Sequence, residues 1–129
     1  MIHRSKAPLR IGLAGGGTDV SPYCDLYGGA ILNATISLYA YANIEPIPEK
    51  KIILQALDRK EEQQFDTGGE LPIDGRLDLL KGVYNKVRNV YGLPDTGFKL
   101  STFVDAPAGS GLGTSSTLVV ALIGAFSEM

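Results

Sequence analysis

Alternating hydrophobic and polar positions dominate the first half of the chain and predict strands. Residues 8–13 form a short hydrophobic segment that runs into a group of glycines. Two alternating segments follow at residues 30–36 and 38–45, and Pro46 comes directly after the second. Because side chains of a strand alternate between its two faces, each segment predicts a half-buried strand. We expect a further strand at residues 52–57.

The second half of the chain carries two helical patterns. Hydrophobic residues between positions 77 and 91 step by three and four, which is the spacing of one helical face. Gly92 follows as a candidate C-cap, and alternation returns as a strand at residues 98–104. Residues 114–126 are hydrophobic on every side, which predicts a buried helix.

Shorter features complete the prediction of the fold. Ser21 is a candidate N-cap for a brief helix with Pro22 at its first position and an end at Gly28. The polar segment 58–64 is expected to be a solvated surface. The order of strands, helix, strand and helix is typical of an α+β or a mixed α/β fold, and of the two we expect α+β.

Composition and charge narrow the class of protein. The chain has 129 residues, a usual length for one domain, and its net charge of −2 gives no electrostatic reason to expect a nucleic-acid partner. Cys24 is the only cysteine, so no intrachain disulfide is possible. The hydrophobic run at 118–126 is too short to cross a bilayer, and the N-terminus has no hydrophobic run typical of a signal peptide. We expect a cytoplasmic protein without a membrane partner.

Glycine is the one unusual residue in the composition, and it is concentrated in two clusters. Sixteen glycines are about 12% of the chain, against a usual ~7%. Residues 107–116 form the stronger cluster, between a predicted strand and a predicted helix, where free N–H groups bind anions. No Walker lysine and no G-x-G-x-x-G spacing is present. The alternative is a glycine-rich turn in which Thr114 or Ser115 only caps the helix.

Residues 107–116 resemble the P-x-x-x-G-L-G-S-S-A motif of the GHMP kinases, with Thr114 in place of the first serine and Ser116 in place of the alanine. The resemblance implies the N-terminal domain of that family over residues 1–129, with a fold like that of ribosomal protein S5 domain 2. It implies ATP and Mg²⁺ as ligands, with Ser115 at the metal. The implied phosphate-binding residues are Gly109, Ser110, Gly111, Leu112, Gly113, Thr114, Ser115 and Ser116.

The first glycine cluster carries a second resemblance. Arg10, Gly15, Thr18 and Asp19 match the R-x-x-x-x-G-x-x-T-D pattern of galactokinases, but Gly16 and Gly17 stand where galactokinases have Glu-His. The segment is more similar to the D-glycero-D-manno-heptose 7-phosphate kinases. Taken alone, it is a turn in which Asp19 caps the following helix. The resemblance implies sugar contacts from Arg10, Gly16, Gly17, Thr18 and Asp19, with Arg10 also the catalytic residue.

These resemblances predict an ATP-dependent sugar kinase that phosphorylates the anomeric hydroxyl of heptose 7-phosphate. Alternatives are an L-fucokinase or a galactokinase-like enzyme and, from another class, a non-catalytic nucleotide- or RNA-binding domain of the S5 type. The last helix stops without a capping glycine. We therefore expect the N-terminal part of a longer protein, whose C-terminal domain is a partner of this one. The resemblance to the GHMP kinases implies a catalytic aspartate downstream of the last helix, outside residues 1–129. We expect residues 1–129 alone to be inactive.

Overall fold

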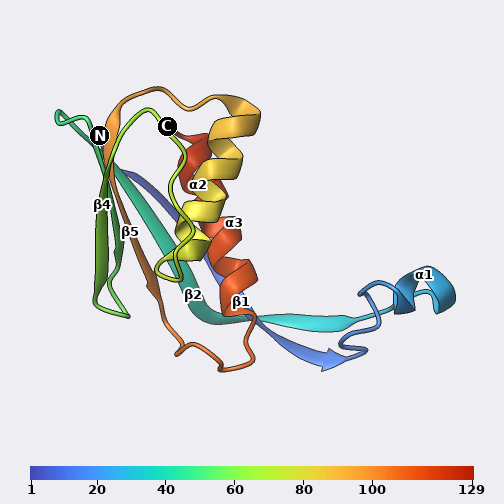
Figure 1. The fold of residues 1–129 in the computed structure, drawn as a ribbon. Helices are drawn as coiled ribbons and strands as arrows, with labels where there is room; N and C mark the ends of the chain where they lie inside the picture. The colour runs from blue at the N-terminus through green and yellow to red at the C-terminus, as the bar shows by residue number, and fades with distance from the viewer.

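The computed structural model describes residues 1–129 as a mixed five-stranded sheet, with two helices on one face and a ribbon that projects from it (Figure 1). The strands stand in the order β1-β2-β5-β3-β4, and only β3 and β5 run parallel. This arrangement confirms the α+β class. The elements are β1 (His3–Ala14), α1 (Tyr23–Tyr27), β2 (Leu32–Ile47), β3 (Lys51–Ala56), β4 (Glu61–Asp66), α2 (Asp78–Tyr91), β5 (Gly97–Val104) and α3 (Thr114–Ser127).

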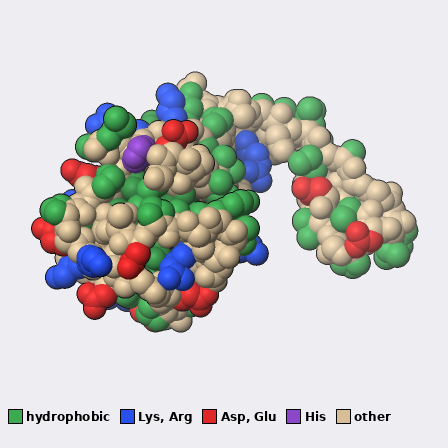
Figure 2. All heavy atoms as spheres, turned by 90° about the horizontal axis from the view of Figure 1, so that it is seen from above, with side chains coloured by type: hydrophobic (Ala, Val, Ile, Leu, Met, Phe, Trp, Pro, Cys, Tyr) green, Lys and Arg blue, Asp and Glu red, His purple; other side chains and the backbone are tan.

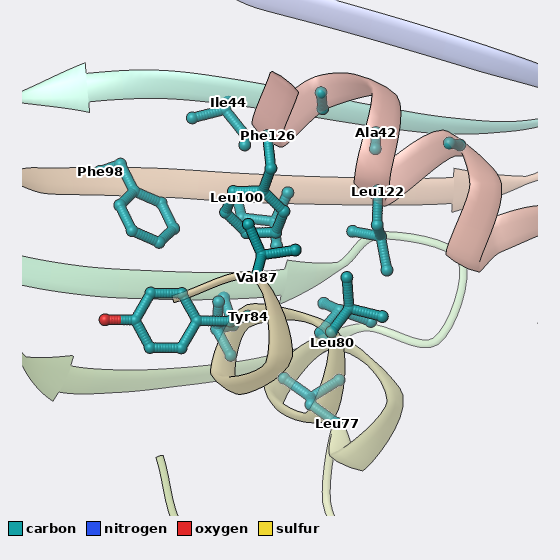
Figure 3. Close-up of a cluster of buried hydrophobic side chains, with 14 of the residues drawn as sticks. Ala42, Ile44, Leu77, Leu80, Tyr84, Val87, Phe98, Leu100, Leu122 and Phe126 are labelled. Carbon is teal, nitrogen blue, oxygen red and sulfur yellow. The ribbon is translucent and has the colours of Figure 1, made fainter. Parts of the chain in front are cut away.

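The core lies between the sheet and the two long helices. The hydrophobic stripe of α2 turns Leu80, Tyr84 and Val87 toward the sheet, as its spacing predicted (Figure 3). The ring of Tyr84 lies 5.8 Å from that of Phe98 on β5 and 6.3 Å from that of Phe126 on α3, measured between centroids. Aromatic pairs at such separations add to the stabilisation that comes from burial. This packing fixes the position of α3, whose N-terminus borders the candidate site.

β2 is one strand of 16 residues, so the prediction of two separate strands is wrong. Pro46 does not end it. The pairing of β1 with β2 ends at His3 opposite Ile44, so the edge of β2 that faces β1 has no partner at Pro46. A proline there removes no interstrand hydrogen bond on that edge. The expected half-burial also fails for residues 30–36, since Leu32 is 59% exposed. There β1 and β2 have left the sheet and form the projecting ribbon.

β4 was not predicted, because residues 58–64 were expected to be a solvated surface. The strand pairs antiparallel with β3 at the edge of the sheet. Its residues alternate between half-buried and exposed, and Phe65 packs against the core from the half-buried side. Charged side chains are common on edge strands because they discourage pairing with another chain.

Two predictions about helices are wrong. α3 is buried only where it faces the sheet and α2, so Val120 and Ile123 remain 60% and 51% exposed. The N-cap of α1 is Pro22 and not Ser21, whose hydroxyl instead donates to the carboxylate of Asp25. No helix of the structure has both the length and the hydrophobicity that a membrane span requires.

Candidate functional site

A glycine loop, residues 106–113, connects β5 to the N-terminus of α3. Gly109, Gly111 and Gly113 all have positive φ angles, between 70° and 79°, and the residues between them do not. Alternation of right- and left-handed residues is typical of backbone nests, in which successive N–H groups can bind an anion. The glycines are therefore required by the backbone conformation of the loop.

The N-terminus of α3 is open to a ligand. Its N-cap is Gly113, and no side chain caps the helix, so the structure does not support the alternative in which Thr114 or Ser115 is only a cap. The first backbone hydrogen bond of the helix runs from Thr117 N to Gly113 O. The N–H groups of the preceding turn are left for a ligand, and the positive end of the helix dipole favours an anion there.

Arg10 reaches both the glycine loop and the first turn of α3 from β1, and its partner Ser116 is 106 positions away in the sequence. Its backbone N–H donates to Leu112 O (3.2 Å), and its Nη1 donates to Ser116 Oγ (3.0 Å). A Cβ atom at Gly113 would lie only 2.7 Å from Arg10 Nη1, so the guanidinium is packed against the loop. The structure thus places a permanent positive charge beside the N–H groups of the glycine loop.

The hydroxyl groups after the loop differ in how they are used. Ser116 Oγ donates to Gly113 O (3.1 Å) and accepts from Arg10. Ser115 is exposed, and its hydroxyl forms no hydrogen bond within the chain. Thr114 likewise forms no side-chain hydrogen bond, so the hydroxyls of Thr114 and Ser115 both remain available to a ligand.

Ser115 and Thr114 also line a small pocket of about 90 Å³. This pocket was not predicted, since Asp58 and Arg59 belong to the polar segment that was expected to be a solvated surface. No pattern in the sequence marks these two residues. The other lining residues are Leu79, Val104, Ala106, Ala108 and Leu118.

The residues present fit a magnesium ion that is held mainly by phosphate. No group of three or more histidine, cysteine or acidic side chains gathers anywhere in the structure, so a site made only of protein ligands is not formed. Mg²⁺ prefers oxygen ligands, keeps several waters and often takes few protein ligands when phosphates are present. The free hydroxyls of Thr114 and Ser115, beside the glycine loop, match that chemistry.

The first glycine cluster lies on the projecting ribbon, away from the sheet (Figures 1 and 2). The Thr18 hydroxyl holds this turn together, since it donates to Gly15 O (2.7 Å) and accepts from Ala30 N (3.1 Å). In contrast, a Cβ at Gly16 would meet no atom within 4 Å, and Asp19 is exposed. No contact joins Asp19 to Arg10, so the structure brings Arg10 to the glycine loop but leaves Asp19 on the ribbon.

Comparisons with known proteins agree on one family. The model of the GHMP kinase N-terminal domain matches residues 78–129. The D-glycero-alpha-D-manno-heptose 7-phosphate kinase of Campylobacter jejuni is 46% identical over 97% of this chain. The crystal structure of a D-glycero-D-manno-heptose 1-phosphate kinase from Bacteroides thetaiotaomicron is 55% identical over 99% of the chain, with a TM-score of 0.92. The mevalonate kinase of Methanococcus jannaschii is 21% identical with a TM-score of 0.79, which shows a shared fold.

The chain spans only part of these relatives. It covers 37% of the length of the Campylobacter protein and 42% of the Bacteroides structure. The similarity therefore concerns an N-terminal domain, and the predicted α+β fold of that domain is confirmed.

Proposed function

The chain belongs to the family of GHMP kinase N-terminal domains, and from this premise we propose that the whole protein is an ATP-dependent sugar kinase. The single observation that carries the proposal is the contact of Arg10 with Ser116 beside the glycine loop. That contact places a cationic side chain against an anion-binding backbone, which is what transfer of a phosphoryl group requires.

In this proposal the glycine loop and the first turn of α3 bind the phosphates of ATP. The implicated residues are Gly109, Ser110, Gly111, Leu112, Gly113, Thr114, Ser115 and Ser116. The small pocket beside Ser115 would take the adjoining part of the nucleotide. Ser115 would hold Mg²⁺, which when bound neutralises charge on the phosphates.

Arg10 would act on the transferred phosphoryl group. Its guanidinium stabilises negative charge that develops during transfer, and the hydrogen bond to Ser116 keeps it oriented. Arg10 forms no salt bridge with a carboxylate of this chain, and we propose that the base comes from another part of the protein.

We propose heptose 7-phosphate, at its anomeric hydroxyl, as the acceptor. The names of the Campylobacter and Bacteroides relatives support a heptose phosphate, and the open space at Gly16 leaves room for a large sugar. Asp19 would accept hydrogen bonds from sugar hydroxyls, with Gly16 and Gly17 giving access and Thr18 holding the turn. Because Asp19 lies on the ribbon, sugar binding would bring the ribbon and the glycine loop to opposite sides of the acceptor.

A substrate panel with the whole protein tests this proposal. ATP and Mg²⁺ are held constant while D-glycero-D-manno-heptose 7-phosphate, L-fucose and galactose are compared by kcat/KM and by the position of the new phosphate. The heptose phosphate should be preferred and should gain a phosphate at C1. A preference for fucose would reassign the acceptor; an L-fucokinase/L-fucose-1-P guanylyltransferase of Bacteroides fragilis is 27% identical to this chain. Binding of ATP without transfer to any sugar would favour a non-catalytic domain.

A further inference from the structure

The chain leaves β5 for the glycine loop at Asp105, and the carboxylate of this residue ends the pairing with β2. The last backbone pair of the two strands is Ala40 with Val104. One residue further, Asp105 N donates to Tyr39 O (2.9 Å), as in a continuing ladder. The second hydrogen bond of this pair, from β2 back to residue 105, goes to a side chain: Tyr39 N donates to Asp105 Oδ2 (2.8 Å). In a regular pair this bond would go to a backbone carbonyl.

The side chain therefore substitutes for the backbone at this position. With the Tyr39 N–H already bonded, the carbonyl of Asp105 is released from β2, and the chain can turn toward Ala106, which is buried. Asp105 thus determines where the strand stops and the glycine loop begins.

A second donor holds the same carboxylate oxygen. The Tyr41 hydroxyl donates to Asp105 Oδ2 (3.2 Å). Burial and the neighbouring Asp105 carboxylate raise the pKa of Tyr41, so its phenol stays protonated and remains a donor at neutral pH. The backbone N–H of Tyr39 and the side-chain hydroxyl of Tyr41 thus hold the same carboxylate oxygen and restrict the orientation of the Asp105 side chain.

The other end of the glycine loop is held by β1. Arg10 N donates to Leu112 O, and β1 and β2 are paired directly, with Pro8 opposite Tyr39. The glycine loop is therefore bonded at both ends to the paired strands β1 and β2. Asp105 bonds to β2 at the entry of the loop, and Leu112 bonds to Arg10 of β1 at its exit. Loss of the Asp105 carboxylate would leave the entry held only by the bond from Asp105 N to Tyr39 O, and so free to change its direction.

We propose that Asp105 is a positioning residue, which fixes the entry of the glycine loop and thereby orients the N–H groups that bind the phosphates of ATP. This proposal rests on the proposed kinase function. Asp105 acts through the loop and touches neither substrate. Its effect should therefore fall on the nucleotide and not on the sugar.

The test compares Asp105→Ala and Asp105→Asn in the whole protein, with Ser101→Ala as the matched control. Ser101 lies on the same strand and bonds to Gln55 of β3, away from the loop. Asp105→Ala should raise the KM for ATP or lower kcat on the order of 10- to 100-fold, because the phosphate-binding groups lose their orientation. The KM for the sugar should stay near the wild-type value. Asp105→Asn should recover most of the activity, since an amide oxygen still accepts from Tyr39 N.

Hydrogen exchange of the unliganded protein gives a readout that does not depend on catalysis. In Asp105→Ala, the amides of Ser110 and Arg10, which donate to Pro107 O inside the loop and to Leu112 O at its exit, should exchange faster than in wild type and in Ser101→Ala, while those of α2 stay unchanged. Unchanged exchange in the loop overturns the proposal, and so does an Asn variant as impaired as the Ala variant. If the wild-type protein phosphorylates no sugar, the kinase proposal fails, but the exchange experiment still decides the role of Asp105.

Discussion

Replacing Gly113 by alanine should separate the role of Arg10 from the conformational requirement of the glycine loop. Gly113 has φ 70° and ψ 33°, a left-handed conformation that costs a residue with a Cβ about 1–2 kcal/mol. The added methyl would also lie 2.7 Å from Arg10 Nη1 and 3.0 Å from its Cζ. Because a guanidinium is the end of a flexible side chain, Arg10 should move and lose its bond to Ser116. That exposed hydrogen bond contributes about 1 kcal/mol more.

Gly92→Ala is the matched control for the backbone cost. Gly92 ends α2 with φ 72°, and a Cβ there would meet no atom within 4 Å. In denaturant unfolding of the whole protein, Gly92→Ala should lose about 1–2 kcal/mol and Gly113→Ala about 2–3 kcal/mol. Only Gly113→Ala should reduce kcat, on the order of 100-fold, because a misplaced Arg10 no longer meets the transferred phosphoryl group.

The result that refutes this reasoning is a Gly113→Ala enzyme with the kcat of Gly92→Ala. Either the position of Arg10 beside Gly113 would then be unimportant for catalysis, or Arg10 would not act on the phosphoryl group at all. Equal losses of stability in the two variants would show that the methyl group fits without displacing the arginine.

Three further predictions concern other parts of the molecule. Ser115→Ala should lower kcat while the KM for sugar is unchanged, and wild-type turnover would remove Ser115 from the metal site. Asp19→Asn should raise the KM for sugar and leave that for ATP unchanged; an effect confined to ATP would contradict its placement at the sugar. Lys81 is fully buried with Nζ 2.6 Å from Asp74 Oδ1, and its hydrogen bond, followed by one from Arg76 N, lowers the pKa of Asp74. Because the pKa of Asp74 is lower in the folded state, its carboxylate stabilises the fold at pH values above the unfolded-state pKa of about 4. This contribution is lost as the pH falls through the folded-state pKa. Urea titrations between about pH 2 and pH 6 should therefore show a smaller acid-induced loss of stability in Lys81→Met than in wild type, and identical pH profiles would rule out this linkage.

Elements with a strong local pattern were predictable from the sequence. The stripe of α2 and the alternation of β3 and β5 reflect the core directly, because the sheet and helices bury those faces. β4 lacks such a pattern, since its polar residues become a strand only through pairing with β3 at the edge of the sheet. Likewise, the exposure of Val120 depends on what covers α3, and the sequence of the helix does not contain that information.

The candidate site was predictable by residue type but not by contact. The glycine loop was identified because its backbone conformation requires a distinctive composition. The contact of Arg10 with Ser116 joins residues 106 positions apart, and no local pattern predicts their distance. Asp105 was missed because a single aspartate at the end of a strand is common, and its role depends on donors on a neighbouring strand.

One irregularity in the β1–β2 pair accounts for both the position of Arg10 and the projection of the ribbon. Pro8 lies opposite Tyr39 and Arg10 opposite Thr35, so residues 36–38 of β2 face the single residue Leu9 of β1. Extra residues in one strand bend the pair and interrupt the ladder. Just beyond the interruption, the Arg10 N–H turns to Leu112 O of the glycine loop, and the ribbon with the predicted sugar residues swings away from the sheet (Figure 1). The bend is therefore the point from which the two proposed substrate sites diverge, and its geometry sets the angle at which they would meet around a sugar.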